Sequence, residues 1–347
     1  MAKHTMEELY QWQALPLSVK IRMSEERIRD WVREYGIDCV YVGISGGKDS
    51  KVLLHIARRL YPNIKAVFVN TGLEHESVRK RGIADADEVL KPEMSFVEVL
   101  KTYGYPIASK EVSQSASEVQ NAIRNKKTPP KYRMDKFNGT HIDKKTGKLS
   151  AYNFPQWKFL IDAPFRISHK CCDVMKKNPS KNYEKKTESK GIIGTMATES
   201  RLRKEKWIQH GCNAFDSERP VSKPLSFWTE QDILQYIYIH NLEIADVYGD
   251  IVYVDSDGLY YDNPMFIQDM KLTTTGAKRT GCVFCMFGIT QDPERFLRLK
   301  KSEPQKYDYV MRGGKFDEQG LWIPHNGLGY VFVIDWLNEH GNLNIKY

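Results

Sequence analysis

Residues 45–50, with the sequence Ser-Gly-Gly-Lys-Asp-Ser, are the part of the chain best suited to chemistry. Two adjacent glycines allow a tight turn and let backbone N–H groups approach a ligand closely. Lys48 supplies a full positive charge, and Ser45 and Ser50 supply hydroxyl groups. The spacing differs from that of the Walker loop, G-x-x-x-x-G-K-[ST]. These residues, called the glycine loop from here on, predict a cradle for an anion, most simply a phosphate group.

The sequence around the glycine loop predicts a strand before it and a helix after it. Residues 39–44 are an apolar run, and residues 51–60 have the apolar spacing of a helix. A helix that begins at the loop adds unpaired N–H donors and a partial positive charge. A second apolar run, residues 65–70, leads into Asn70, Thr71 and Gly72. Because parallel strands place their carboxyl ends at one edge of a sheet, both motifs are expected to face one pocket.

The order of the predicted elements indicates an α/β fold. Helical spacing covers residues 9–35, a third strand is expected over residues 94–98, and residues 192–195 are expected to be another strand that ends in a turn. Strands that alternate with helices predict a doubly wound parallel sheet with helices on both faces. A hairpin is expected around residues 252–260, and a basic helix over residues 293–301.

Length and composition bound the organisation of the chain. Its 347 residues, 41% of them hydrophobic, suit one large or two modest domains. We expect an N-terminal helical segment (1–35), a nucleotide-binding domain (36–240) and a small cysteine-containing C-terminal extension (241–347). No apolar stretch approaches the roughly 18 residues of a membrane helix. The N-terminus is not followed by the apolar region that a secretory signal needs. We therefore expect a cytoplasmic protein with no membrane partner.

Most of the excess positive charge lies in one stretch, which we call the basic insertion (residues 124–150). The net charge of the chain is +8, and residues 124–148 contain nine basic and two acidic residues. Proline and glycine pairs predict an exposed loop or hairpin here. The insertion is a candidate contact for nucleic acid, and a solvated lysine-rich loop is the alternative. The candidate contact residues are Lys126, Lys127, Lys131, Arg133, Lys136, Lys144 and Lys145.

Two cysteine pairs form the second strong signal, Cys171-Cys172 and Cys282-x-x-Cys285. Four thiolates can hold a tetrahedral zinc ion or a 4Fe-4S cluster. Structural zinc sites usually combine two C-x-x-C-like knuckles, so an adjacent pair with a distant C-x-x-C is unusual for zinc. Zinc and unliganded thiols are the alternatives.

The chain resembles the PP-loop (HUP-like) superfamily of adenine-nucleotide α-hydrolases, and within it the phosphoadenylyl-sulfate/adenylyl-sulfate reductase-like family. The glycine loop matches the family's SGGKDS loop, and the four cysteines match the cluster pattern of assimilatory adenylyl-sulfate reductases. Residues 171–179, 194–203 and 223–232 are similar to further family motifs, as are Tyr248 and residues 279–282.

The resemblance implies a substrate, cofactors and site residues. The substrate would be ATP with Mg²⁺ or an adenylyl sulfonucleotide. Lys48, Asp49 and Ser50 would be catalytic, and Lys176 would lie beside a 4Fe-4S cluster held by Cys171, Cys172, Cys282 and Cys285. The implied nucleotide-binding residues are Ser45, Gly46, Gly47, Lys48, Asp49, Ser50, Asn70, Thr71, Gly72, Gly194, Glu199, Ser200 and Arg203.

The chain departs from the family's reductases in ways that bear on its activity. Those reductases attack the sulfate sulfur with a cysteine near their C-terminus, whereas no cysteine follows Cys285 here. Met196 and Ala197 stand where the family has an arginine pair, and Asn70 replaces an aspartate. Outside the two pairs, Cys212 and Cys39 are the only other cysteines, and a loop cysteine without a catalytic role is the favoured interpretation of Cys212.

These departures favour an ATP pyrophosphatase or adenylyltransferase over a sulfonucleotide reductase. Lys48 would stabilise the departing pyrophosphate, and Asp49 would orient Mg²⁺ or the attacking group. The resemblance extends to phage, mobile-element and DNA-phosphorothioation proteins, which implies sulfur transfer, with nucleic acid as a candidate acceptor and a cysteine desulfurase as a candidate donor. We expect a homodimer. A thiol-dependent reductase and a non-catalytic nucleotide-binding regulator are the alternatives.

Overall fold

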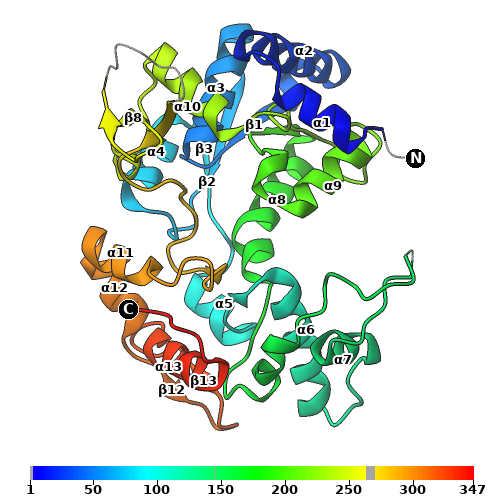
Figure 1. Ribbon diagram of the computed structural model, residues 1–347, viewed down its shortest axis with the longest axis vertical. Coiled ribbons are helices and arrows are strands. Elements are labelled where there is room, and N and C mark those ends of the chain that lie inside the picture. Colours follow the sequence, from blue (N-terminus) through cyan, green and yellow to red (C-terminus); the bar gives the residue numbers. More distant parts are fainter. Residues whose placement is uncertain (1–2, 145, 263–269) are drawn as a thin grey trace. The chain divides into compact units, whose positions relative to one another are not determined.

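The computed structural model describes residues 3–144, 146–262 and 270–347, which form two compact units (Figure 1). Unit 1 combines Met1–Lys91 with Pro179–Gly281, and unit 2 combines Pro92–Asn178 with Cys282–Tyr347. The chain thus leaves unit 1 and later returns to it. For this reason the units have different boundaries from the three consecutive segments expected from the sequence.

A mainly parallel six-stranded sheet forms the centre of unit 1, which confirms the predicted α/β fold. Its strand order is β3-β2-β1-β5-β7-β6, and only β6 is antiparallel to its neighbour. The direction of winding reverses beside β1, so ligands are expected at the carboxyl end of that strand. The strands are β1 (Val40–Ile44), β2 (Lys65–Val69), β3 (Glu88–Leu90), β5 (Lys190–Ile193), β6 (Asn213–Ala214) and β7 (Val221–Ser222).

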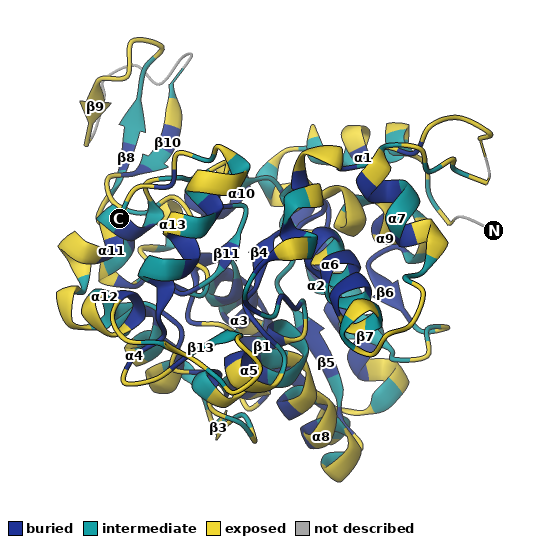
Figure 2. Cartoon of the chain, turned by 90° about the horizontal axis from the view of Figure 1, so that it is seen from below, coloured by how far each residue is buried: buried dark blue, intermediate teal, exposed yellow. Residues whose placement is uncertain are grey.

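Helices pack on both faces of this sheet, because successive strand residues point to opposite sides. On one face Val42 and Phe68 join a large core that includes Ile56 of α3 and Ile237 of α10. On the other face Tyr41 and Val67 pack with Tyr183 of α8. Figure 2 shows β1 as mostly buried, and the two middle residues of β5 are buried as well. The helices of unit 1 are α1 (Met6–Gln13), α2 (Leu17–Tyr35), α3 (Lys48–Leu60), α4 (Glu76–Asp85), α8 (Asn178–Thr187, whose first residue belongs to unit 2), α9 (Arg201–His210) and α10 (Glu230–His240).

Two further expectations for unit 1 have clear outcomes. The predicted hairpin is confirmed, because β8 (Ile251–Val254) pairs antiparallel with β9 (Tyr260–Tyr261), and β10 (Lys271–Thr274) pairs along the other side of β8. The helical structure expected over residues 9–35 is confirmed, and it consists of two helices, α1 and α2. Pro16 separates α1 from α2, since proline lacks the N–H that a helix interior needs.

Unit 2 contains mostly helices, joined by short strand pairs. Strand β4 (Ile107–Ala108) pairs parallel with β11 (Met286–Phe287), and β12 (Lys315–Phe316) pairs antiparallel with β13 (Trp322–Ile323). A π-helical turn covers Asp173–Lys177. The α-helices of unit 2 are α5 (Phe96–Thr102), α6 (Lys110–Arg124), α7 (Lys131–Asn138), α11 (Arg295–Ser302), α12 (Pro304–Met311) and α13 (Tyr330–Gly341).

The strand expected over residues 94–98 was wrong, because this segment begins helix α5. Ser95 caps the helix: its hydroxyl accepts the backbone N–H of Glu98, and the Glu98 carboxylate accepts the backbone N–H of Ser95 at 2.7 Å. This reciprocal capping box outweighs the strand preference of Phe96 and Val97. The third strand of the sheet is instead β3, closer to the glycine loop in sequence.

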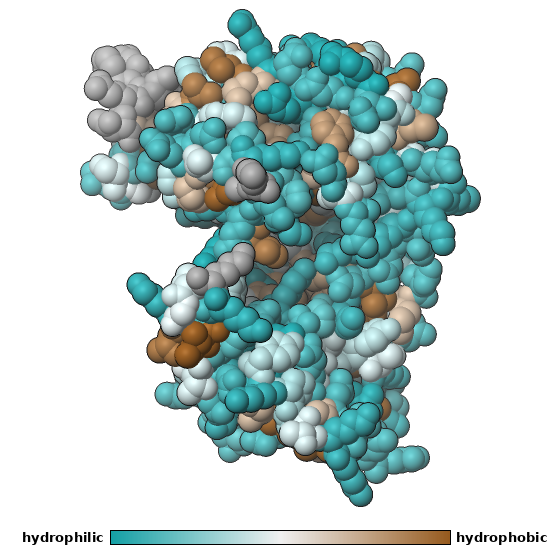
Figure 3. All heavy atoms as spheres, turned by 90° about the vertical axis from the view of Figure 1, so that its right-hand side faces the viewer, coloured by the Kyte–Doolittle hydropathy of each residue, from teal (hydrophilic) through white to brown (hydrophobic). Residues whose placement is uncertain are grey.

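On the face drawn in Figure 3, hydrophilic residues cover most of the surface and hydrophobic residues are scattered among them. Among the described residues, no helix is both long and apolar enough to span a membrane.

Candidate functional site

The glycine loop joins β1 to α3, as predicted, and its backbone is tightly packed. Gly46 has φ +73°, and a Cβ atom there would lie 2.1 Å from the carbonyl oxygen of Val78. No residue other than glycine fits this position without a rearrangement. Ser50 braces the turn, because its hydroxyl accepts the backbone N–H of Ser45 at 3.1 Å and donates to the carbonyl of Gly47 at 2.9 Å. The hydroxyl of Ser50 therefore serves the loop itself.

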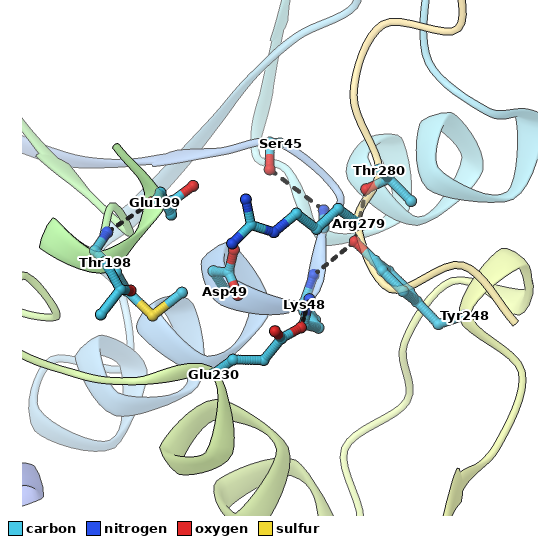
Figure 4. A pocket seen from close by; sticks show the side chains of 11 residues that line it. Ser45, Lys48, Asp49, Thr198, Glu199, Glu230, Tyr248, Arg279 and Thr280 are labelled. Carbon is cyan, nitrogen blue, oxygen red and sulfur yellow. Dashed lines mark hydrogen bonds and ion pairs between the residues drawn. The ribbon is translucent and has the colours of Figure 1, made fainter. Parts of the chain in front are cut away.

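A pocket opens beside the loop, and Figure 4 shows the side chains that line it. They come from the loop, from the segment after β5, from the first turn of α10 and from the segment after β10. The lining residues are Ser45, Gly47, Lys48, Asp49, Met196, Thr198, Glu199, Glu230, Tyr248, Arg279 and Thr280. None of them is a cysteine.

Lys48 is buried, and its ammonium group is held by two acceptors. It donates to the carbonyl oxygen of Lys278 at 2.7 Å and lies 3.1 Å from Oε1 of Glu230 (Figure 4). Tyr248 lies on the other side: its ring is 5.3 Å from the ammonium group, and its hydroxyl accepts the backbone N–H of Lys48 at 3.4 Å. Thr280 is hydrogen-bonded to the same hydroxyl at 2.6 Å. These contacts hold the first turn of α3 in place.

Asp49 carries an acceptor atom that the protein leaves unsatisfied. Its Oδ1 is buried and has no hydrogen-bond partner. Burial raises the pKa of this carboxyl, and the charge of Lys48 opposes that rise, as do Arg203 and Arg279 more weakly. A buried carboxylate oxygen without a partner requires a donor or a cation. The pocket thus combines cationic groups with one acceptor that a bound ligand or metal ion would satisfy.

Four of the predicted nucleotide-binding residues follow β5 and support the pocket from that side. They are Gly194, Glu199, Ser200 and Arg203. A Cβ atom at Gly194 would lie 3.0 Å from the carbonyl oxygen of Asp49, so a small residue lets β5 pass close to α3. Ser200 caps α9 by accepting the backbone N–H of Arg203 at 3.3 Å. Glu199 forms an ion pair with Arg203 and accepts the backbone N–H of Met196 at 2.8 Å. Of these four residues, only Glu199 lines the pocket.

The predicted nucleotide-binding residues at the end of β2 do not line this pocket. They are Asn70, Thr71 and Gly72. Their polar groups bond locally: the Asn70 side chain accepts the backbone N–H of Gly72 at 3.3 Å, and the Thr71 hydroxyl donates to Glu74 at 2.7 Å. Their assignment to the nucleotide therefore stays a prediction.

Sequence reasoning on site residues missed Glu230, Arg279, Tyr248, Thr280 and Thr198. Residues 223–232 were noted as similar to a family motif, and Glu230 within them is the first residue of α10. The match over residues 279–282 was noted only as a family feature, although Arg279 and Thr280 line the pocket.

The four paired cysteines all belong to unit 2. Cys171 and Cys172 precede the π-helical turn, and Cys282 and Cys285 precede β11. The thiol of Cys171 donates to Cys172 and lowers the pKa of Cys172 to about 6, with help from Lys110 and Lys176. Burial raises the pKa of Cys285 to about 11.

Hydrogen-bond donors contact the sulfur of Cys285 and the backbone carbonyls beside it. The Cys285 sulfur accepts the backbone N–H of Phe287 at 3.4 Å, and Arg295 donates to the carbonyl of Cys285. Tyr330, buried on α13, donates to the carbonyl of Phe284 at 2.7 Å. In the described residues, no group of three or more His, Cys, Asp or Glu side chains is arranged to hold a metal ion.

The basic insertion matches the predicted exposed loop or hairpin only in part: Ile142 and Leu149 form an antiparallel bridge, whereas an earlier part of the insertion is helical. Residues 131–138 form α7, and Arg133 and Lys136 are buried. Arg133 pairs with Glu118 and Glu111 at 2.8 Å, and Lys136 pairs with Glu111 at 2.6 Å. Both glutamates lie on α6, so these two cations hold α7 against α6. Lys126, Lys127, Lys131 and Lys144 are exposed, and Lys145 lies outside the described residues.

Comparisons with known proteins give one family. The model of the phosphoadenosine phosphosulfate reductase domain matches residues 39–133 and 144–286. Among solved structures, the phosphoadenylyl-sulfate (PAPS) reductase from Candida auris in a phosphate complex is similar at 12% identity, with a TM-score of 0.36, over 70% of this chain and 90% of that chain. No curated protein sequence matches the chain.

Proposed function

Because the chain belongs to the phosphoadenosine phosphosulfate reductase family, we propose that unit 1 binds ATP beside the glycine loop and cleaves it between the α- and β-phosphates. The observation that carries this proposal is the composition of the pocket. It offers the cations Lys48 and Arg279 and the unsatisfied oxygen of Asp49, but no thiol among its lining residues. Such a site suits charge stabilisation of a phosphate better than thiol attack on sulfur.

Different residues of the pocket would have different roles in this reaction. An acceptor oxygen attacks the α-phosphorus, the bond from that phosphorus to the bridging oxygen breaks, and pyrophosphate leaves. The start of α3, with its N–H groups and Lys48, would stabilise the charge on the leaving group. Asp49 is the residue in the pocket that would hold Mg²⁺, since its Oδ1 lacks a partner. When bound, Mg²⁺ would neutralise phosphate charge.

The acceptor activated in this way would next be attacked by the outer sulfur of a donor persulfide, and AMP would leave with the acceptor oxygen. A thiol reductant would then supply the two electrons that break the S–S bond to the donor. We infer a nucleic-acid acceptor and a cysteine desulfurase as donor, as in the DNA-phosphorothioation branch of the family. The exposed lysines 126, 127, 131 and 144 support contact with a polyanion. Arg133 and Lys136 are excluded from that role, because their charges are already paired with α6.

We propose that the four paired cysteines of unit 2 hold a 4Fe-4S cluster, although no three of these four described residues are arranged to hold a single metal ion. Four sulfur donors in one unit, an N–H group bonded to the Cys285 sulfur, and nearby cations are the surroundings that such clusters use. Cys171, Cys172, Cys282 and Cys285 would hold the cluster, which would supply iron as a binding site for sulfur. Lys110 and Lys176 would offset the negative charge of the thiolates.

A sulfonucleotide reductase is the second candidate, and the family match favours it. That reaction needs a reactive thiol, which must be accessible and easily ionised. Cys212 of unit 1 is 4% exposed, and burial raises its pKa. Cys212 is therefore unsuited to be the nucleophile.

The test is release of AMP and pyrophosphate from ATP by the full chain in the presence of DNA, a cysteine desulfurase, cysteine and a thiol reductant. Lys48→Ala should lower the rate at least about a hundredfold, since removing one stabilising donor has an effect of that size. Lys51→Ala is the matched control, because Lys51 lies on the same helix but pairs with Asp85 at 2.8 Å. Equal rates in the two variants would remove the proposed role of Lys48.

A further inference from the structure

Unit 2 contains a second cationic pocket that the proposed reaction does not use. Its volume is about 560 Å³, within the usual range for sites that bind small molecules. Three side-chain amides and two guanidinium groups dominate its lining, which consists of Asn121, Arg124, Asn125, Arg166, Gln319 and Leu321. All six residues belong to unit 2.

The two arginines face neutral partners instead of carboxylates. Arg124 donates to the side-chain oxygens of Gln120 at 2.9 Å and Asn121 at 3.4 Å, and Arg166 donates to that of Gln319 at 3.2 Å. In the described part of the chain, neither guanidinium forms an ion pair with a carboxylate. The Nε group of Arg166 is buried and has no hydrogen-bond partner. One donor of this pair is thus left for a ligand.

The like charges of the two arginines are close enough to interact. Burial lowers the pKa of Arg124, the charge of Arg166 lowers it further, and Asp317 opposes this. One oxygen of Asp317, Oδ1, accepts the backbone N–H groups of Gln319 and Leu321, both at 2.9 Å. An anion placed between the guanidiniums would relieve their repulsion.

The fold positions both arginines with backbone contacts. Arg124 lies in the last turn of α6, where the helix dipole stabilises a cation. The carbonyl of Arg166 accepts the N–H of Tyr105 at 2.8 Å. A Cβ atom at Gly104, which has φ +113°, would lie 2.2 Å from that carbonyl oxygen. Glycine is therefore required for the chain to hold Arg166 where it is. Exposed Lys126 and Lys127 follow α6 directly and extend the positive charge.

From these contacts we infer that the pocket of Arg124 and Arg166 binds the phosphate group of a nucleotide. Planar guanidinium groups match phosphate oxygens in pairs of hydrogen bonds. The side-chain amides and Leu321 would contact the attached sugar or base. The nucleotide is either free or one unit of a single strand, and the site is independent of whether unit 1 hydrolyses ATP.

The test compares two adenine-free probes on the full chain: thymidine monophosphate, and single-stranded oligothymidylate of about 12 nucleotides. We expect the double variant Arg124→Gln/Arg166→Gln to bind the probes at least about tenfold more weakly. A tenfold change corresponds to the loss of one good charged contact. For the oligothymidylate strand, we plot the logarithm of the association constant against the logarithm of the salt concentration. We expect the negative slope of this plot to be about 1.4 smaller in magnitude in the double variant. Arg298→Gln, which removes an exposed cation paired with Asp292, should change neither.

Modification of the unaltered protein tests the site without a substitution. Phenylglyoxal reacts with arginine, and the bound probe should protect Arg124 and Arg166 but not Arg298. Protection by both probes would identify a site for free nucleotides, and protection by the strand alone would identify a strand site. No protection by either probe, or unchanged affinity in the double variant, would overturn the proposal.

Discussion

The ammonium group of Lys48 lies 3.1 Å from Oε1 of Glu230, which pairs the first residue of α3 with the first residue of α10. The Lys48 side chain is 5% exposed and that of Glu230 is 41% exposed. The carboxylate of Glu230 is thus an anionic partner of Lys48, as a bound phosphate would be. A phosphate that enters the pocket must compete with this carboxylate.

Glu230→Gln should therefore bind ATP more tightly. Removing the competing carboxylate frees Lys48, and a pair exposed on one side is worth at most about 1 kcal/mol. We expect the Kd for ATP to fall about two- to fivefold, as measured by calorimetry. Glu243→Gln, which removes an exposed glutamate paired with Arg81, should leave it unchanged. Weaker binding in Glu230→Gln would show that Glu230 supports the ligand.

Asp49→Asn should lower kcat for ATP cleavage about a hundredfold, a typical loss for one electrostatic group in an active site. The reason is the buried Oδ1, which has no protein partner and is available to a cation or to the attacking group. The measurement is pyrophosphate release at saturating Mg²⁺. Asp85→Asn, which affects only the pairing of Lys51, is the control. A rate within twofold of the unaltered chain would exclude this role.

Cys212→Ala should keep the ATP-cleaving activity of the chain. Cys212 is buried within the core of unit 1, and burial raises its pKa, so it is a poor nucleophile. We expect the rate of pyrophosphate release to stay within about twofold, with a loss of stability of roughly 1 kcal/mol. If the variant stays folded by circular dichroism but loses turnover, Cys212 takes part in the reaction.

Stability in acid should depend on Glu118. Its side-chain hydrogen bonds to Arg133 lower the pKa of Glu118 to about 2, from an ordinary 4.5. A lowered pKa contributes stability that is present above about pH 4.5 and is lost as the pH falls towards 2. Glu118→Gln should flatten the dependence of the urea midpoint on pH in this window. Exposed Glu318, replaced by Gln, is the control. An unchanged slope would contradict the assignment.

The sequence was informative where structure depends on neighbouring residues. The apolar run before the glycine loop and the helical spacing after it became β1 and α3, and the alternation of elements led to the correct fold class. The capping box of Ser95 and Glu98 is also local, but the apolar residues beside it were interpreted as a strand. That error came from giving strand preference more weight than capping.

Other features depend on residues far apart in the chain, and pattern alone did not reveal them. Glu230 reaches Lys48 only because α10 packs beside α3. Arg133 and Lys136 resemble the other cations of the basic insertion in sequence, but the folded chain pairs them with glutamates of α6. Charge density predicted a basic surface, whereas folding decides which charges stay exposed.

The most direct test of the central claim is the identity of the products that the full chain forms. Purified protein would be given ATP with Mg²⁺, DNA and a cysteine desulfurase with cysteine and a thiol reductant, or phosphoadenylyl sulfate with a thiol reductant, and nucleotide and sulfur products would be separated. The proposed function predicts AMP and pyrophosphate from ATP, dependent on Lys48, and no sulfite from the sulfonucleotide. Sulfite release without cleavage of ATP would contradict it and identify a reductase.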